Sequence, residues 1–285
     1  MPTGIRNAVD VTAIVAAMQT LETNANWNGK TATLRCTDIA NVVVARLAIY
    51  GVHAPALDVR NLDAQGLNGQ FDYQPWTLQV NETLAADIAP TAPANAAEDL
   101  RLRRMAIAQF ADTITHEARH CEQWFRMARL IAEQFRAKGM LVTAKVVAGK
   151  LRPSSEYAAN VNEPAIGTAI TYSALNPLSA LEKSEVESWF ESVYGSGGSS
   201  RELRYNPAFG NRTQVQTKVG GQQTTAISQG VQVQAFASYQ RGLAEEEDAH
   251  GLGLHIQTAY LTPYGLAPNP MVTNHGPVAA GIQRY

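Results

Sequence analysis

Apolar residues recur at three- and four-residue spacing in several stretches of the chain, separated by polar segments rich in Gly, Pro and Asn. This period places apolar side chains on one face of an α-helix, so each stretch predicts an amphipathic helix. The shorter helices that we expect span residues 9–23, 38–50, about 140–150 and 178–194. The chain is therefore expected to be mainly helical.

The longest helical pattern runs from about residue 96 to residue 138. Asn95 followed by Glu98 forms a capping-box arrangement at its start, and Gly139 is expected to end it. An apolar stripe along this helix predicts a buried face. Its members are Phe110, Ile114, Cys121, Trp124, Ala128, Ile131 and Phe135.

Residues 51–95 have a different character, because Gly, Pro, Asn and Asp are frequent there. Apolar and polar residues alternate over residues 69–73, and the alternation resumes one step out of phase after Pro75. A period of two with a phase slip at a proline predicts an edge strand that carries a bulge. A surface hairpin is the alternative interpretation.

The last third of the chain is less regular. Residues 195–200 contain only Gly and Ser and predict a flexible segment. Residues 201–285 are rich in Gln, Thr and Gly, which favours a β/loop region, either separate or packed on the same domain. We therefore expect an α+β fold in which residues 1–194 form a mainly helical domain with a small edge-strand sheet.

Composition narrows the class of protein. Of the 285 residues 45% are apolar and 17% are charged, which favours a globular chain with a sizeable core. The net charge of −2 gives no reason to expect a nucleic-acid partner. Cys36 and Cys121 are too few for a disulfide framework. No apolar run is long enough to span a membrane, and no Sec-type signal is visible. We expect a cytoplasmic protein, with signal-independent secretion by a specialised system as the alternative.

The middle of the long helix contains the pattern His-Glu-x-x-His, as His116-Glu117-Ala118-Arg119-His120. Residues four apart lie above one another on a helix, so both imidazoles can bind one cation from the same face. Glu117 lies one step along, where it can take a proton from a water at that cation. Zinc suits this arrangement, because it accepts three protein ligands and leaves a fourth position for water. Asp112, one turn earlier, is a candidate acceptor for the second N–H of His116.

With this motif the sequence resembles the zincins, metallopeptidases whose H-E-x-x-H helix lies behind a substrate-binding edge strand. The resemblance covers about residues 70–195 and implies that His116 and His120 bind zinc while Glu117 is the general base. The metzincin extension with a third His is absent, since Cys121-Glu122-Gln123-Trp124 follows the motif. The resemblance therefore implies a gluzincin-like site, in which a Glu from a later helix is the third ligand.

Several glutamates are candidates for that third ligand. Glu185 is preferred, because it lies one turn before a tryptophan that is expected to face the core, and because its surroundings resemble the ligand helix of some gluzincin-like families. Glu182 and Glu187 are close alternatives. Glu163 ranks lower, since Pro164 disfavours a helical conformation in the residue before it.

Other polar residues are assigned weaker roles. Cys121 lies on the apolar stripe and is expected to be a buried, inert thiol. The acidic run at residues 245–248 is interpreted as a solvated helix end. The remaining candidates for transition-state donors are His53, His250, His255, His275, Tyr157, Tyr172 and Tyr194.

The leading hypothesis is a zinc-dependent peptidase that uses zinc-activated water and Glu117 as general base. The strand at residues 69–81 is expected to hold a polypeptide substrate by backbone pairing. These features suit an intracellular protease with a narrow target or a bacterial effector delivered by a dedicated machine; a hydrolase of non-peptide amides is a further alternative. The rival class is a non-catalytic assembly or adaptor protein with a structural or vacant metal site, whose delivery or assembly partner binds the C-terminal region.

Overall fold

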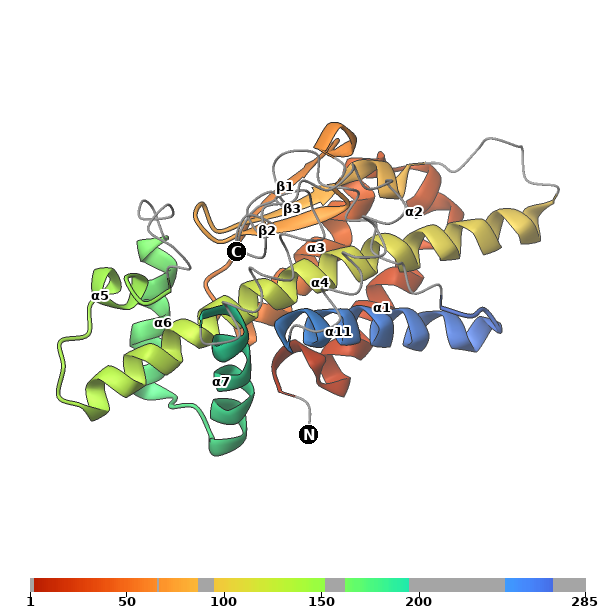
Figure 1. Cartoon of the computed structure of the whole chain (residues 1–285). Coiled ribbons are helices and arrows are strands. Elements are labelled where there is room, and N and C mark those ends of the chain that lie inside the picture. The colour runs from red at the N-terminus through yellow and green to blue at the C-terminus, as the bar shows by residue number, and fades with distance from the viewer. Residues whose placement is uncertain (1–2, 66, 87–94, 152–161, 195–243, 269–285) are drawn as a thin grey trace, which may run out of the picture. The chain divides into compact units, whose positions relative to one another are not determined.

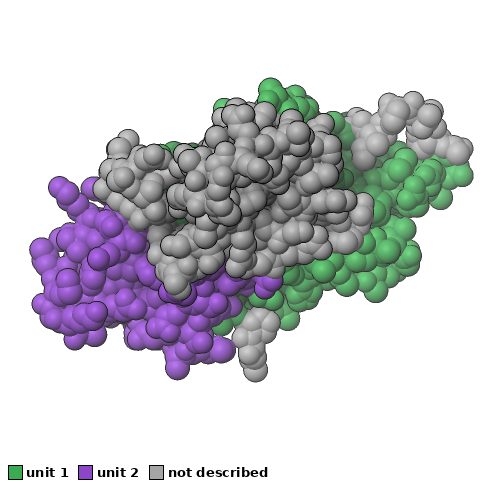
Figure 2. Space-filling model, in the orientation of Figure 1, with its two compact units in different colours: residues 1–124, 249–271 green, residues 125–248, 272–285 purple. Residues whose placement is uncertain are grey.

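The computed structural model of the chain describes residues 3–65, 67–86, 95–151, 162–194 and 244–268 (Figure 1). These residues are mostly helical with one small sheet, which confirms the α+β prediction. They fall into two compact units, one within residues 1–124 and 249–271 and the other within 125–248 and 272–285 (Figure 2). Two of the boundaries lie inside helices, namely α4 (Ala96–Ala137) and α11 (Ala244–Leu261), and the predicted domain of residues 1–194 stays a prediction.

The first unit begins with the short 3₁₀ helix Gly4–Arg6, followed by α1 (Ala8–Leu21), α2 (Asn24–Asn28) and α3 (Ala32–Ile49). The two longer helices confirm the predictions made from their apolar period. Helix α3 begins six residues earlier than expected, because the side chain of Thr31 accepts the backbone N–H of Leu34 and caps the helix there.

The sheet has three strands in the order β1-β3-β2, from β1 (Ala56–Arg60), β2 (Gly69–Asp72) and β3 (Thr77–Asn81). Strand β1 is parallel to β3, whereas β2 is antiparallel to it. Residues 69–81 therefore form a hairpin, which was the alternative interpretation, and the prediction of one continuous bulged strand is wrong, although β2 does lie at an edge of the sheet. The phase slip at Pro75 marks the turn where the chain reverses between β2 and β3. Parallel pairing with β1 on its other side makes β3 the central strand.

Two short 3₁₀ helices flank this hairpin, at Asp63–Gln65 and Glu82–Ala85. Helix α4 (Ala96–Ala137) then confirms the longest helix predicted from the sequence. Asn95 accepts the backbone N–H of Glu98 at 3.0 Å, and Gly139 takes a positive φ of 66° just beyond the last turn. Residues 110–132 are all buried, so the middle of α4 is enclosed on every face, its polar side chains included.

The second unit contains α5 (Ala144–Ala148), α6 (Glu163–Leu175) and α7 (Ala180–Tyr194). Helices α5 and α7 lie where their periods predicted them. Helix α6 is not among the predicted helices, and the expectation that Pro164 disfavours a helical conformation at Glu163 is wrong. Proline is tolerated in the first turn, where its missing N–H has no helical partner, and Asn162 caps the helix by accepting the N–H of Ala165 at 2.9 Å.

The last described elements are α11 (Ala244–Leu261) and the 3₁₀ helix Thr262–Tyr264. The expected β/loop character is therefore wrong for residues 244–261; the Gly/Ser segment at 195–200 lies outside the described residues. Apolar residues at helical spacing, including Leu252, Ile256 and Tyr260, are fully buried along α11. Among the described helices, none combines the length and hydropathy that a membrane span requires.

Two glycines inside α11 have opposite packing requirements. A β-carbon at Gly253 would overlap Oδ1 of Asp112, whereas at Gly251 its nearest neighbour would be Nη2 of Arg6 at an ordinary 3.7 Å. We expect Gly251→Ala to raise the free energy of unfolding by about 0.5–1 kcal/mol through helix propensity. Gly253→Ala is expected to lower it by about 1–3 kcal/mol, because Asp112 must move within a packed core. Urea unfolding of both variants tests the contrast, and equal effects would contradict it.

Candidate metal centre

The two histidines of the motif point to one position from the same face of α4. Their Nε2 atoms are 3.1 Å apart, their ring planes are inclined by 85°, and both side chains are buried. Two nitrogens bound to one tetrahedral zinc ion at 2.0–2.1 Å would lie about 3.3 Å apart. The spacing of His116 and His120 therefore fits a shared zinc ion.

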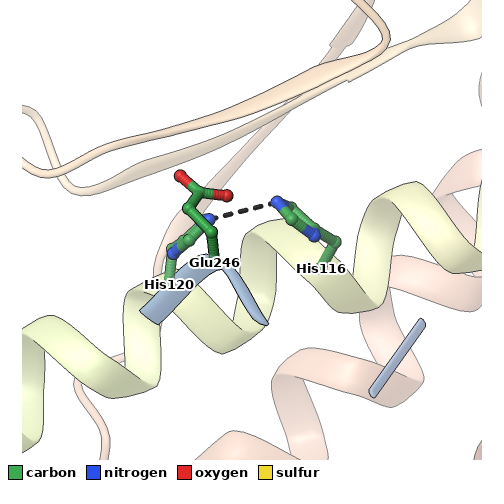
Figure 3. Close-up of side chains that lie close together, drawn as sticks. All are labelled: His116, His120 and Glu246. Carbon is green, nitrogen blue, oxygen red and sulfur yellow. Dashed lines mark hydrogen bonds between the residues drawn. The ribbon is translucent and has the colours of Figure 1, made fainter. Parts of the chain in front are cut away.

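A third candidate ligand comes from α11. One carboxylate oxygen of Glu246 and one ring nitrogen of each histidine all lie within 4.8 Å of one another. Figure 3 shows this carboxylate beside the dashed line that joins the two ring nitrogens. Glu246 is only 2% exposed, and one turn further along α11 the ring of His250 lies 4.4 Å from that of His116. The described residues thus offer a His-His-Glu donor set.

Glu246 belongs to the acidic run that the sequence predicts to be solvated. This prediction is wrong for three of the four residues, since Glu245, Glu246 and Asp248 are buried and Glu247 alone is exposed. The signal that could have found Glu246 is its spacing of four from His250, which places both side chains on one face if the segment is helical. The glycines after His250 concealed that helix.

The glutamates favoured by the sequence lie in other surroundings. The carboxylates of Glu185 and Glu182 are 3.9 Å and 3.5 Å from Nη1 of Arg126, on α4. Glu187 is exposed on α7, and Glu163 is exposed at the first position of α6. None of the four belongs to the His-His-Glu group found among the described residues. The third ligand stays a prediction, and this geometry favours Glu246 over Glu185.

Glu117 joins the motif to the sheet. The backbone N–H of Phe71 in β2 donates to Oε2 of Glu117 at 2.9 Å, and this carboxylate is buried. Gly69 permits the approach, because a β-carbon there would lie 2.6 Å from Cγ2 of Thr113 and 3.1 Å from Cγ of Glu117. The proposed base is therefore held at a fixed position between α4 and β2.

This contact concerns the strand that was predicted to bind a peptide. Strand β3 pairs with a neighbour on both sides, whereas β2 lies at an edge of the described sheet. On β2, the backbone N–H of Phe71 already donates to Glu117. Backbone pairing of a peptide with residues 69–81 stays a prediction, and β2 is the strand that offers an edge for it.

Asp112 binds α11 through its carboxylate. Nε2 of Gln257 donates to Oδ2 at 2.7 Å, while Oδ1 lies against Gly253. The predicted role toward His116 stays a prediction. Burial raises the pKa of Asp112 from 3.8 to about 6, and the hydrogen bond from Gln257 opposes this rise.

This pKa shift predicts a pH-dependent stability. Because the folded state holds the Asp112 proton more tightly than the unfolded state, the free energy of unfolding falls as pH rises from about 4 to 6. The loss is on the order of 3 kcal/mol and persists above pH 6. We expect Asp112→Asn to remove it, so that the variant is more stable than the wild type at pH 7. Urea unfolding of both zinc-free proteins from pH 4 to 8 measures the difference; a constant difference across that range would contradict the shift.

The structure places Cys121 and some of the candidate transition-state donors, while others lie outside the described residues. Cys121 is fully buried, and burial raises the pKa of its thiol well above the usual value, which fits an inert role. The carbonyl of His53 accepts the indole N–H of Trp76, and His255 is exposed on α11. Tyr172 lies beside the guanidinium of Arg129, in the second unit. The remaining three lie outside what the structure describes, for Tyr194 its side chain only: His275, Tyr157 and Tyr194.

No protein-family model matches the chain, and no curated protein or solved structure shows significant similarity to it. The resemblance to zincins therefore rests on the His-Glu-x-x-His motif alone.

Proposed function

We propose that the chain is a zinc-dependent hydrolase that cleaves peptide bonds. His116, His120 and Glu246 would hold the ion, and Glu117 would act as the general base. The observation that carries this proposal is that a ring nitrogen of each histidine and a carboxylate oxygen of Glu246 lie within 4.8 Å of one another. Glu117 directly follows His116 in the same motif. Catalytic zinc sites commonly use three protein ligands of these types.

The donor set fits zinc on chemical grounds, because imidazole nitrogen and carboxylate oxygen are both usual zinc ligands. When bound, zinc polarises a carbonyl group and lowers the pKa of water. Glu117 would accept the proton of the attacking water and transfer it to the leaving amine. The hydrogen bond from the N–H of Phe71 would hold this carboxylate in place for the transfer.

A structural metal site in a non-catalytic protein is the second candidate, and burial favours it. The three proposed ligands are 2–5% exposed, and α4 is enclosed on every face around them. A structural ion would add folding stability without leaving a position for water. The two functions make different predictions for the same purified protein.

The experiment measures zinc content and the cleavage of a mixed peptide library, before chelation, after chelation and after zinc is added back. The proposed function predicts about one zinc per chain, with cleavage that disappears and returns with the metal. Bound zinc that raises the melting temperature but supports no cleavage would favour the structural site. Protein that binds no zinc would contradict both.

A further inference from the structure

Gln123 lies on α4 one turn beyond His120 and is buried, with 1% of its surface exposed. Its Oε1 atom is 2.8 Å from Nδ1 of His120, a hydrogen bond of ordinary length. The amide oxygen can only accept a hydrogen bond, so the ring nitrogen must donate. This contact therefore assigns the proton of a neutral His120 to Nδ1.

A neutral imidazole carries one proton, and a proton on Nδ1 leaves the lone pair on Nε2. Nε2 of His120 is the atom that lies 3.1 Å from Nε2 of His116, at the proposed metal position. We propose that Gln123 is a positioning residue for the metal, which selects the binding tautomer of His120 and fixes the direction of its ring. This inference rests on the metal site in the proposed function.

The local geometry explains how one glutamine can select the tautomer of His120 and also fix the direction of its ring. Residues three apart are neighbours on a helix surface, so helix α4 alone holds His120 and Gln123 beside each other. Burial removes competing water from the hydrogen bond, which makes the alternative tautomer costly, because that tautomer would lose the bond between Nδ1 of His120 and Oε1 of Gln123. Loss of such an outer hydrogen bond typically weakens metal binding 10- to 100-fold.

The test is a zinc titration of the full chain in competition with a chromogenic chelator, without substrate. We expect Gln123→Leu to weaken zinc binding about 10- to 100-fold. Gln123→Glu keeps an acceptor oxygen at the same distance and is expected to restore affinity to about the wild-type value. If Gln123→Leu does not fold, Gln123→Met removes the acceptor with an unbranched side chain of similar length.

Gln257→Leu is the matched control. It also replaces a buried glutamine on a helix, but its amide binds Asp112 and none of the proposed ligands. We expect it to lower thermal stability and to leave zinc affinity close to that of the wild type.

Wild-type zinc affinity in Gln123→Leu would overturn the proposal, as would an equal loss in Gln257→Leu or no rescue by Gln123→Glu. Because zinc binding is measured without substrate, a zinc-binding chain that cleaves no peptide would sink the proposed hydrolase and leave the role of Gln123 standing. A wild-type chain without zinc affinity would end both.

Discussion

Glu117→Gln is expected to lower kcat for peptide cleavage by about 10²- to 10⁴-fold while the protein keeps its zinc. Proton transfer by a positioned carboxylate contributes a factor of this size, and an amide cannot accept the proton of the attacking water. The variant preserves the rest of the contact, because the amide oxygen of Gln can still accept the N–H of Phe71 that now binds Oε2. The measurement is the cleavage rate per bound zinc, with zinc content determined on the same sample.

Glu187→Gln is the control for this variant. Glu187 is exposed on α7 and does not belong to the His-His-Glu group. Its substitution by Gln removes one negative charge, as the substitution at Glu117 does. It is expected to cleave at the wild-type rate. Full activity in Glu117→Gln, with zinc bound, would show that Glu117 is not the general base.

Glu246→Gln is expected to weaken zinc binding by more than about 100-fold. Loss of a partner that only supports a ligand already costs 10- to 100-fold, and removal of a direct anionic ligand costs more. The side chain changes its charge but hardly its volume, so α11 should keep its packing. Competition with a chelator measures the dissociation constant, and circular dichroism confirms that the helix content is unchanged.

Glu185→Gln is the matched variant on α7, since Glu185 is the ligand that the sequence favours. Its carboxylate lies 3.9 Å from the guanidinium of Arg126, and we expect its loss to leave zinc affinity unchanged. The opposite pattern, with zinc lost in Glu185→Gln and retained in Glu246→Gln, would support Glu185, the ligand chosen from the sequence. It would contradict the assignment of Glu246 as the third ligand.

The parts of the fold that the sequence predicts correctly are determined by neighbouring residues. Helix α4 is one of these parts, because its cap at Asn95, its apolar period and its terminator Gly139 all lie within the segment itself. The convergence of His116 and His120 is another, since a spacing of four on a helix fixes it without any tertiary contact. Local signals of this kind need no knowledge of the rest of the chain.

The parts that the sequence could not predict depend on contacts between distant segments. Glu246 is recognised only when α11 lies along α4, and Gly253 permits that approach while lowering the helix propensity of the same segment. The hairpin at residues 69–81 was ambiguous for a similar reason. A period of two gives the faces of a strand but not its partner, and pairing of β3 with the distant β1 decides that β3 is central.

The position of Glu246 along the chain has a consequence for biosynthesis. A ribosome completes the motif in α4 long before it reaches α11, so the nascent protein presents two histidines without the proposed third ligand. If Glu246 is that ligand, the order of synthesis would delay metal capture by the complete donor set until translation is well advanced and the late helix has packed.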